Sequence, residues 1–125
     1  MNVRLTCLAG AIALASFASA GESKSQSRYL TKPLTGDFYM YGGSLGDSTP
    51  PTEKDRKLSL MVTGPLAKDL FDHLGPDIND ACGVGPDQRE RGKGDLSCIW
   101  TKSEGYLCYV GLDLRTGKSM RGLTC

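Results

Sequence analysis

The sequence predicts an α+β fold: a small antiparallel sheet of about four to five strands, with one amphipathic helix packed on one face and disulfides tying the parts together. Three observations predict it. Residues 94–101 and 105–114 are rich in aromatic and branched side chains and are bounded by turn formers, which is typical of paired strands. Residues 65–74 place apolar side chains at helical spacing. Cysteines at four positions beyond residue 80 indicate two disulfides in an exported chain.

The chain begins with the pattern of a secretory signal. Arg4 gives a positive start, residues 5–17 are largely apolar, and residues 18–20 read Ala-Ser-Ala, a small-x-small cleavage motif. The apolar run is too short to span a bilayer as a helix, and Cys7 lies too early to be a lipid-attachment cysteine. We therefore expect cleavage after residue 20, a periplasmic or secreted bacterial protein, and no membrane span.

The chain that remains after cleavage has a balanced charge. Residues 1–20 contain one charged residue, Arg4, so 14 of the 15 Lys and Arg stay, against 14 Asp and Glu. A nucleic-acid or anionic-membrane partner would favour a basic surplus, and neither is expected. We expect a flexible segment over residues 21–35 and a single small domain over residues 36–125.

The first part of the domain predicts two strands with a loop between them. Residues 36–41 are aromatic-rich and predict the first strand. Residues 42–54 are dense in Gly, Ser, Pro and Thr, which predicts a long loop. Residues 57–63 alternate apolar with polar or flexible side chains, so we expect a half-buried strand there.

A helix follows this strand. Pro65 suits a first helical turn, and Gly75 followed by Pro76 stops the helix. Its apolar residues fall on one face, which predicts that this face covers the sheet: they are Leu66, Ala67, Leu70, Phe71 and Leu74. Residues 83–94 are charged and rich in glycine, and we expect a mobile loop there.

The last quarter of the chain predicts a three-stranded meander. The short loop between the first two strands places Cys98 opposite Cys108. A two-residue turn at 116–117 places Cys108 opposite Cys125, whereas a three-residue loop would slip this pairing by one position and exchange the faces. The core face of this meander is predicted from the alternation of side chains: Leu96, Cys98, Trp100, Tyr106, Cys108, Val110, Leu112, Leu114, Leu123 and Cys125.

The cysteines are expected to form two disulfides. Since three of them lie in one row, Cys82 must take one of the three. We expect Cys82–Cys98 together with Cys108–Cys125, so that the first bridge closes the charged loop. A zinc site is the alternative, but the sequence has no C-x-x-C and a single histidine, so no metal is expected.

The outer face of the predicted sheet carries the first interaction signal. Ile99 and Leu107 are neighbours there with Tyr109 alongside, and Gly111 and Gly122 oppose each other and leave a shallow depression. Exposed apolar and aromatic side chains of this kind are typical of a partner surface. The alternative is cover by the N-terminal segment around Tyr29 and Leu30.

The second interaction signal is the charge-dense loop over residues 87–93. Arg89 and Arg91 lie in it, and a loop tied by a disulfide is suited to insertion into a cleft. The alternative is an ordinary solvated loop. We take Ile99, Leu107, Tyr109, Arg89 and Arg91 as the predicted partner-binding residues.

No set of residues predicts catalysis. Ser44 stands in a G-x-S-x-G match, but a proline-rich loop follows it where a nucleophile elbow needs a helix. His73 is the single candidate base, and we expect a structural role for it near the helix end. Carboxylates that could form a pair for glycoside chemistry are expected to be solvated surface: Glu53, Asp55, Asp69 and Asp72.

Residues 77–80 have the spacing of a calcium loop, but the following positions do not. Ala81 stands where an oxygen ligand belongs, Cys82 replaces the glycine and Gln88 replaces the glutamate. An acidic cluster at a helix end is the preferred interpretation, with a weak calcium site as the alternative.

These observations favour an exported, non-enzymatic binding protein without a cofactor. In its general features the chain is similar to small exported proteins of Gram-negative bacteria, including periplasmic inhibitors, although no motif places it in a family. We expect another envelope or secreted protein as partner, with inhibition of a cell-wall hydrolase as the specific hypothesis, and a monomer or weak homodimer. The alternatives are a small hydrolase that uses Ser44 or a carboxylate with His73, and a structural or ligand-binding envelope component.

Overall fold

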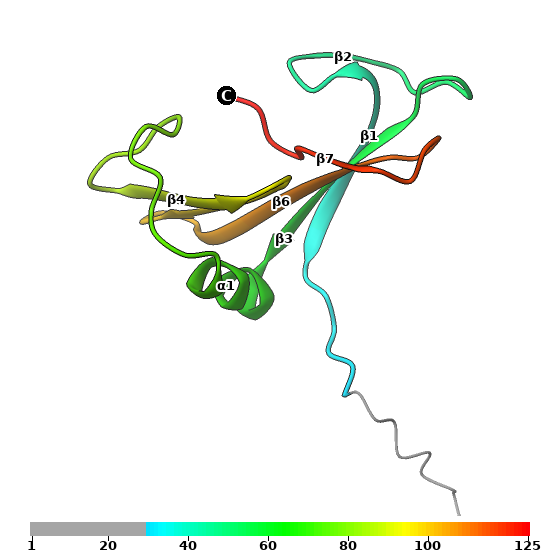
Figure 1. The fold of residues 1–125 in the computed structure, drawn as a ribbon. Helices are drawn as coiled ribbons and strands as arrows, with labels where there is room; N and C mark the ends of the chain where they lie inside the picture. The colour runs from blue at the N-terminus through cyan, green and yellow to red at the C-terminus, as the bar shows by residue number, and fades with distance from the viewer. Residues whose placement is uncertain (1–29) are drawn as a thin grey trace, which may run out of the picture. The chain divides into compact units, whose positions relative to one another are not determined.

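An open antiparallel sheet with one helix below it makes up the unit Lys32–Cys125 (Figure 1). The computed structural model describes residues 30–125, so the predicted signal at 1–20 and most of the segment 21–35 lie outside it. The helix is α1 (Gly64–His73). The strands are β1 (Gly36–Ser44), β2 (Asp47–Thr49), β3 (Lys57–Thr63), β4 (Gln88–Lys93), β5 (Leu96–Thr101), β6 (Gly105–Asp113) and β7 (Ser119–Met120).

The strands follow the order β2-β1-β3-β6-β5-β4, and every neighbouring pair is antiparallel. Strand β7 pairs with β6 at Gly111 and Leu112, beyond the end of β5. The antiparallel sheet and its single helix confirm the coarse prediction. The described residues hold seven strands rather than four or five, so the fold is mostly β and not clearly α+β.

The additional strands lie in segments that were predicted as loops or turns. Residues 83–94 were predicted to be a mobile loop, but Gln88–Lys93 form β4 and pair along the whole of β5. The prediction was wrong because cross-strand packing outweighs the low strand propensity of this charged run. The side chain of Arg91 lies over the ring of Phe71, 4.4 Å from its centroid, and Glu90 is buried on the opposite side of the strand.

The Gly/Pro-rich segment after residue 41 also contains a strand. Residues 36–41 of β1 pair with β3, whereas Gly42, Gly43 and Ser44 pair with β2. Figure 1 shows β1 leaving the sheet at this point, so that β2 lies above the sheet and α1 below it. A left-handed Gly43, with φ of 71°, is part of this bend.

The hydrophobic core lies between α1 and the sheet. The helix starts directly after β3, has Pro65 in its first turn and ends before a left-handed Gly75, as the sequence predicts. Ala67 and Phe71 are buried against Val62, Cys98 and Cys108. The partly buried side chains around this cluster include Leu96, Trp100 and Tyr106, which confirms this part of the predicted core face.

The disulfides are Cys98–Cys108 and Cys82–Cys125, so the predicted pairing was wrong. Cys98 does lie opposite Cys108, as predicted. The error came from the last strand: β7 is two residues long and pairs Gly111 with Met120, so Cys125 never enters the row. Two opposed cysteines then bond to each other, and Cys125 bonds to Cys82. Two disulfides indicate an oxidising, extracytoplasmic compartment.

Among residues 30–125, no helix is long and apolar enough to cross a membrane. The single helix there has 10 residues.

Candidate functional site

The side of the sheet that faces α1 has a second apolar region, which the helix does not cover. Cross-strand pairing aligns Phe38 with Leu60 and Val110 in one row, and Met40 with Leu58 and Leu112 in the next. Leu60 packs against the core cluster, whereas the others lie outside it. We call these others the apolar patch: Phe38, Met40, Leu58, Val110 and Leu112.

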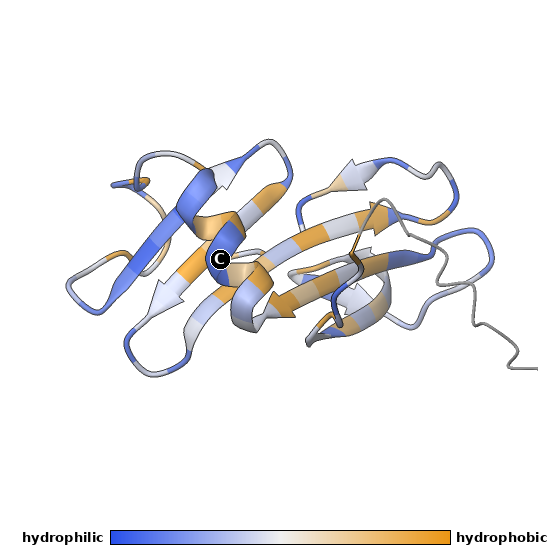
Figure 2. Cartoon of the chain, turned by 90° about the horizontal axis from the view of Figure 1, so that it is seen from below, coloured by the Kyte–Doolittle hydropathy of each residue, from blue (hydrophilic) through white to orange (hydrophobic). Residues whose placement is uncertain are grey.

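The apolar patch is open to solvent. The side chain of Phe38 is 71% exposed, and the other four are half-buried. Figure 2, which views the molecule from the helix side, shows apolar positions continuing along the strands beside α1. The helix packs on β6, β3 and β5, and its 10 residues span only about 15 Å. The patch is therefore left uncovered by the length and position of α1.

The opposite side of the sheet has a cleft of about 630 Å³. Its floor comes from β4 and β5, one wall comes from the segment after β7 and the Cys82–Cys125 disulfide, and the other comes from the tip of the β1–β2 hairpin. The lining residues are Ser44, Leu45, Gly46, Cys82, Gln88, Glu90, Ser97, Ile99, Arg121, Leu123, Thr124 and Cys125.

Glu90 is the buried acidic residue of this cleft. Its side chain lines the cleft although the residue is only 8% exposed. The Ser97 hydroxyl donates to Oε1 over 2.8 Å. Within residues 30–125, the carboxylate makes no ion pair and Oε2 has no hydrogen-bond partner. Oε2 is therefore open to the cleft, and a polar atom that lines a cleft without a protein partner is a candidate for a ligand contact.

The segment after β7 crosses this side of the sheet and fills the depression that was predicted between two glycines. Gly111 faces Met120 rather than Gly122, and the backbone of Gly122 packs on Val110. The buried Ser59 hydroxyl donates to the Gly122 carbonyl over 2.6 Å. Leu123 and Cys125, which were predicted on the core face, instead line the cleft, because the chain leaves the sheet after β7.

The predicted partner residues Ile99, Leu107 and Tyr109 lie on the cleft side. Ile99 is opposite Leu107, as predicted. All three are half-buried, and Ile99 lines the cleft. Burial raises the pKa of Tyr109, with a smaller contribution from the charge of Glu104. The cover on this side therefore includes the chain's own C-terminal segment.

The predicted partner residues Arg89 and Arg91 lie on the other side, against the helix end. Both bind Asp77, Arg89 with Nε 2.6 Å from Oδ2 and Arg91 with Nε 2.7 Å from Oδ1. The hydrogen bonds from these arginines lower the pKa of Asp77 to about 2. Arg91 also donates to the carbonyl of Phe71 over 3.0 Å. The structure thus separates the five predicted residues into two groups on opposite sides of the sheet.

Ser44 and His73 are not brought together. Ser44 lies at the hairpin tip, where its hydroxyl accepts from the backbone N–H of Asp47 over 3.2 Å. His73 lies at the end of α1 on the other side of the sheet, with Nδ1 2.7 Å from the carbonyl oxygen of Asp69. Within the part of the chain that the structure describes, no three His, Cys, Asp or Glu side chains gather as a metal site.

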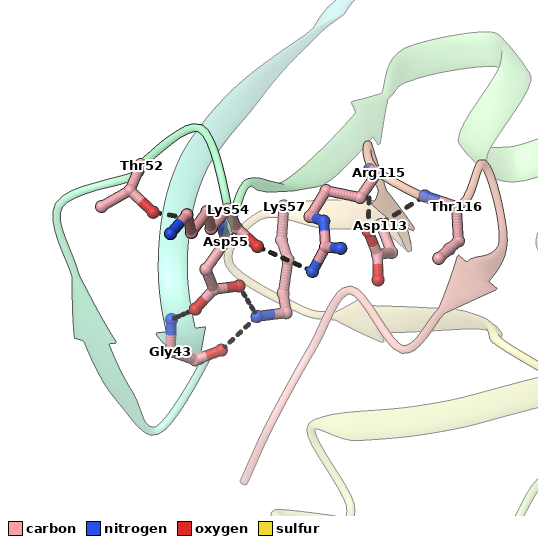
Figure 3. A network of polar contacts seen from close by, with 8 residues as sticks. All are labelled: Gly43, Thr52, Lys54, Asp55, Lys57, Asp113, Arg115 and Thr116. Atoms are coloured by element: carbon pink, nitrogen blue, oxygen red, sulfur yellow. Dashed lines mark hydrogen bonds and ion pairs between the residues drawn. The ribbon is translucent and has the colours of Figure 1, made fainter.

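A polar network holds the hairpin above the sheet (Figure 3). The N–H of Gly43 donates to Asp55 over 2.6 Å, and Lys57 binds both Asp55 and the carbonyl of Gly43. The bonds from Lys57 and Gly43 lower the pKa of Asp55. Arg115 donates to the carbonyl of Lys54 over 2.9 Å. The partners of Asp55 are thus Gly43 and Lys57, which hold the hairpin. They are not the second carboxylate that glycoside chemistry requires.

No family model matches the chain, and the comparisons with curated proteins and with solved structures found no significant match.

Sequence reasoning missed both the apolar patch and the buried Glu90. Apolar residues stand on both faces of residues 36–41, so the alternation there hides which face stays open. Glu90 lies between two arginines in a charged run, a pattern typical of solvated surface. The available signal was Glu90 alternating with Arg89 and Arg91, which places it on the opposite face of a strand.

Proposed function

We propose that the chain is an exported, non-enzymatic binding protein that contacts another protein through the apolar patch. The observation that carries this proposal is the open row that begins at Phe38, whose side chain is 71% exposed. Half-buried apolar side chains of three strands adjoin Phe38, and a contiguous, partly exposed apolar surface of this kind is typical of an interaction site. The aromatic ring supplies the type of anchor that dominates interface energies.

Within this class, we propose an inhibitor or immunity-type protein in the bacterial periplasm that blocks a cell-wall hydrolase. The secretory signal pattern and the two disulfides support the compartment. The separation of Ser44 from His73 supports a binding role over a hydrolase that uses this pair. The rigid sheet supports the mode of binding, because a preorganised surface loses little conformational entropy on association.

The test compares capture of envelope proteins by three forms of residues 21–125, purified with both disulfides intact. These are the natural chain, Phe38→Ser, and a matched control, Val84→Ser. Val84 is an exposed apolar residue, 36% exposed, in the segment before β4 and outside the apolar patch. Circular dichroism and urea unfolding establish that all three are folded.

We expect the natural chain and Val84→Ser to bind one envelope protein in equimolar amount, and Phe38→Ser to lose at least about tenfold in affinity. The captured protein is then purified and assayed for peptidoglycan hydrolysis with and without the chain. Equal capture by all three forms would overturn the assignment to the apolar patch. A partner whose hydrolysis is not inhibited would overturn inhibition. A homodimer that Phe38→Ser dissociates would replace the proposed partner with a second copy.

A further inference from the structure

We infer that the cleft opposite α1 binds a small ligand with a free amino group, of the amino-acid or short-peptide class. This inference goes beyond the protein contact proposed above. The cleft lies on the other side of the sheet and shares no lining residue with the apolar patch.

The carboxylate of Glu90, which lines the cleft, determines the charge of the ligand. The residue is 8% exposed, and the single hydrogen bond of its carboxylate within residues 30–125 is the 2.8 Å bond from Ser97 to Oε1. An ammonium group that enters the cleft would donate to the remaining acceptor positions and supply the missing opposite charge. Hydrogen bonds between two charged groups are stronger than those between neutral groups.

The size and lining of the cleft determine the class of ligand. Its volume of about 630 Å³ is typical of small-molecule pockets. Apolar side chains line it from three separate parts of the chain, Leu45 from the hairpin, Ile99 from β5 and Leu123 from the C-terminal segment. A ligand with a short aliphatic side chain would contact these residues while its amino group reaches Glu90.

Arg121 provides a second charged group at the same cleft. Its side chain is exposed, and it makes no ion pair within the described part of the chain. A guanidinium group is well suited to a carboxylate, which it can bind with two parallel hydrogen bonds. Glu90 and Arg121 together favour a zwitterion, with an ammonium group at one and a carboxylate at the other.

The walls of the cleft are fixed before any ligand binds. The Cys82–Cys125 disulfide ties the C-terminal segment to the chain before β4. The bond from Ser59 to Gly122 anchors the same segment on the sheet, and the network around Asp55 holds the hairpin. Preorganisation of this kind reduces the entropy lost on binding.

The experiment is an NMR titration of the exported chain, with both disulfides intact, using the dipeptide Leu-Ala and its N-acetyl and C-amide forms as probes. The variants are Glu90→Gln, which keeps the shape and the bond to Ser97, and Arg121→Gln at the exposed rim. Glu53→Gln is the matched control, because Glu53 is an exposed glutamate outside the cleft. Phe38→Ser is added to separate this site from the apolar patch.

We expect Leu-Ala to shift the amide signals of Ser97, Ile99 and Leu123 at millimolar concentrations or below. The N-acetyl form should bind at least about tenfold more weakly, as should Leu-Ala to Glu90→Gln. Glu90→Gln should leave the affinity for the N-acetyl form unchanged, whereas Glu53→Gln and Phe38→Ser should bind Leu-Ala as the natural chain does. Arg121→Gln should weaken Leu-Ala more than its C-amide form.

Two results would overturn the inference. One is the absence of Leu-Ala shifts at these cleft residues in the natural chain. The other is that Glu90→Gln weakens the free and N-acetylated dipeptides equally, since Glu90 would then have no interaction with the amino group. If Glu90→Gln does not fold, the comparison of Leu-Ala with its N-acetyl form in the natural chain, together with Arg121→Gln, still decides between the outcomes.

Discussion

The helix side of the sheet has two apolar halves that differ in one respect, the presence of α1. Where the helix covers the sheet, Val62, Cys98 and Cys108 are buried, and Phe71 of the helix packs against them. Beside the helix, the same alternation on β3 and β6 leads to Leu58 and Leu112, which stay half-exposed with Phe38 alongside. Alternation along a strand therefore decides which side is apolar, whereas the length of the helix decides how much of that side becomes core.

Each half contains one phenylalanine, Phe71 in the covered half and Phe38 in the open half. Replacing each in turn gives the largest expected difference in the free energy of unfolding. Phe71 is 1% exposed, makes an edge contact with Tyr106 at 5.3 Å between centroids, and lies beneath Arg91. Phe71→Ala should lower the free energy of unfolding by about 4 kcal/mol, because a large core side chain is lost and a cavity is left. Urea unfolding with the disulfides intact measures this.

Phe38→Ala is the matched control and should change the free energy of unfolding by less than about 0.5 kcal/mol. A similar loss for both variants would show that Phe38 belongs to the core and would remove the basis for the apolar patch.

The parts of the fold that could be predicted from the sequence are those that depend on local pattern and not on distant contacts. The helix over residues 65–74 and the opposition of Cys98 and Cys108 could be predicted because each depends on local periodicity and a short loop. Strand β4 could not, since the guanidinium groups of Arg89 and Arg91 lie over the ring of Phe71, which belongs to a helix distant in the sequence. The path of Cys125 could not either, because a two-residue strand leaves almost no pattern.

The candidate surfaces were less predictable than the fold. Ile99, Leu107 and Tyr109 were correctly placed on one face, but the C-terminal segment that crosses that face depends on tertiary contacts at Ser59 and Val110. Glu90 is buried by the fold and not by its neighbours in the sequence. The position of Glu90 on the cleft side of β4 places a carboxylate in the cleft.

On the cleft side, the sheet is covered by the segment after β7 instead of by a helix. A substitution at Gly122 tests how closely this segment packs on the sheet. A Cβ atom at Gly122 would lie 2.6 Å from the carbonyl carbon of Val110, closer than such atoms approach. Gly122→Ala should therefore lower the free energy of unfolding by about 2 kcal/mol, as overpacking does. Gly85→Ala is the control, because no heavy atom lies within 4 Å of its Cβ position. Equal stability of the two variants would show that the segment is not packed on β6.

The smallest expected effect on stability comes from the ion pairs at the end of α1, at the edge of the covered half. Asp77 binds Arg89 and Arg91 at the end of α1, and these bonds lower its pKa to about 2, against about 3.9 in an unfolded chain. A depressed carboxyl pKa stabilises the folded state above the unfolded value, and this contribution is lost as the pH falls from about 4 towards 2. Asp77→Asn should therefore be less stable than the natural chain at neutral pH.

The stability difference between the natural chain and Asp77→Asn should shrink as the pH falls through this range, and urea unfolding at a series of pH values measures it. Asp80→Asn is the control, because Asp80 is exposed and makes no ion pair within residues 30–125. A difference for Asp77→Asn that stays constant down to pH 2 would show that the charge of Asp77 does not hold the arginines. The contact of Arg91 with the ring of Phe71 would then be what holds β4 against the end of α1.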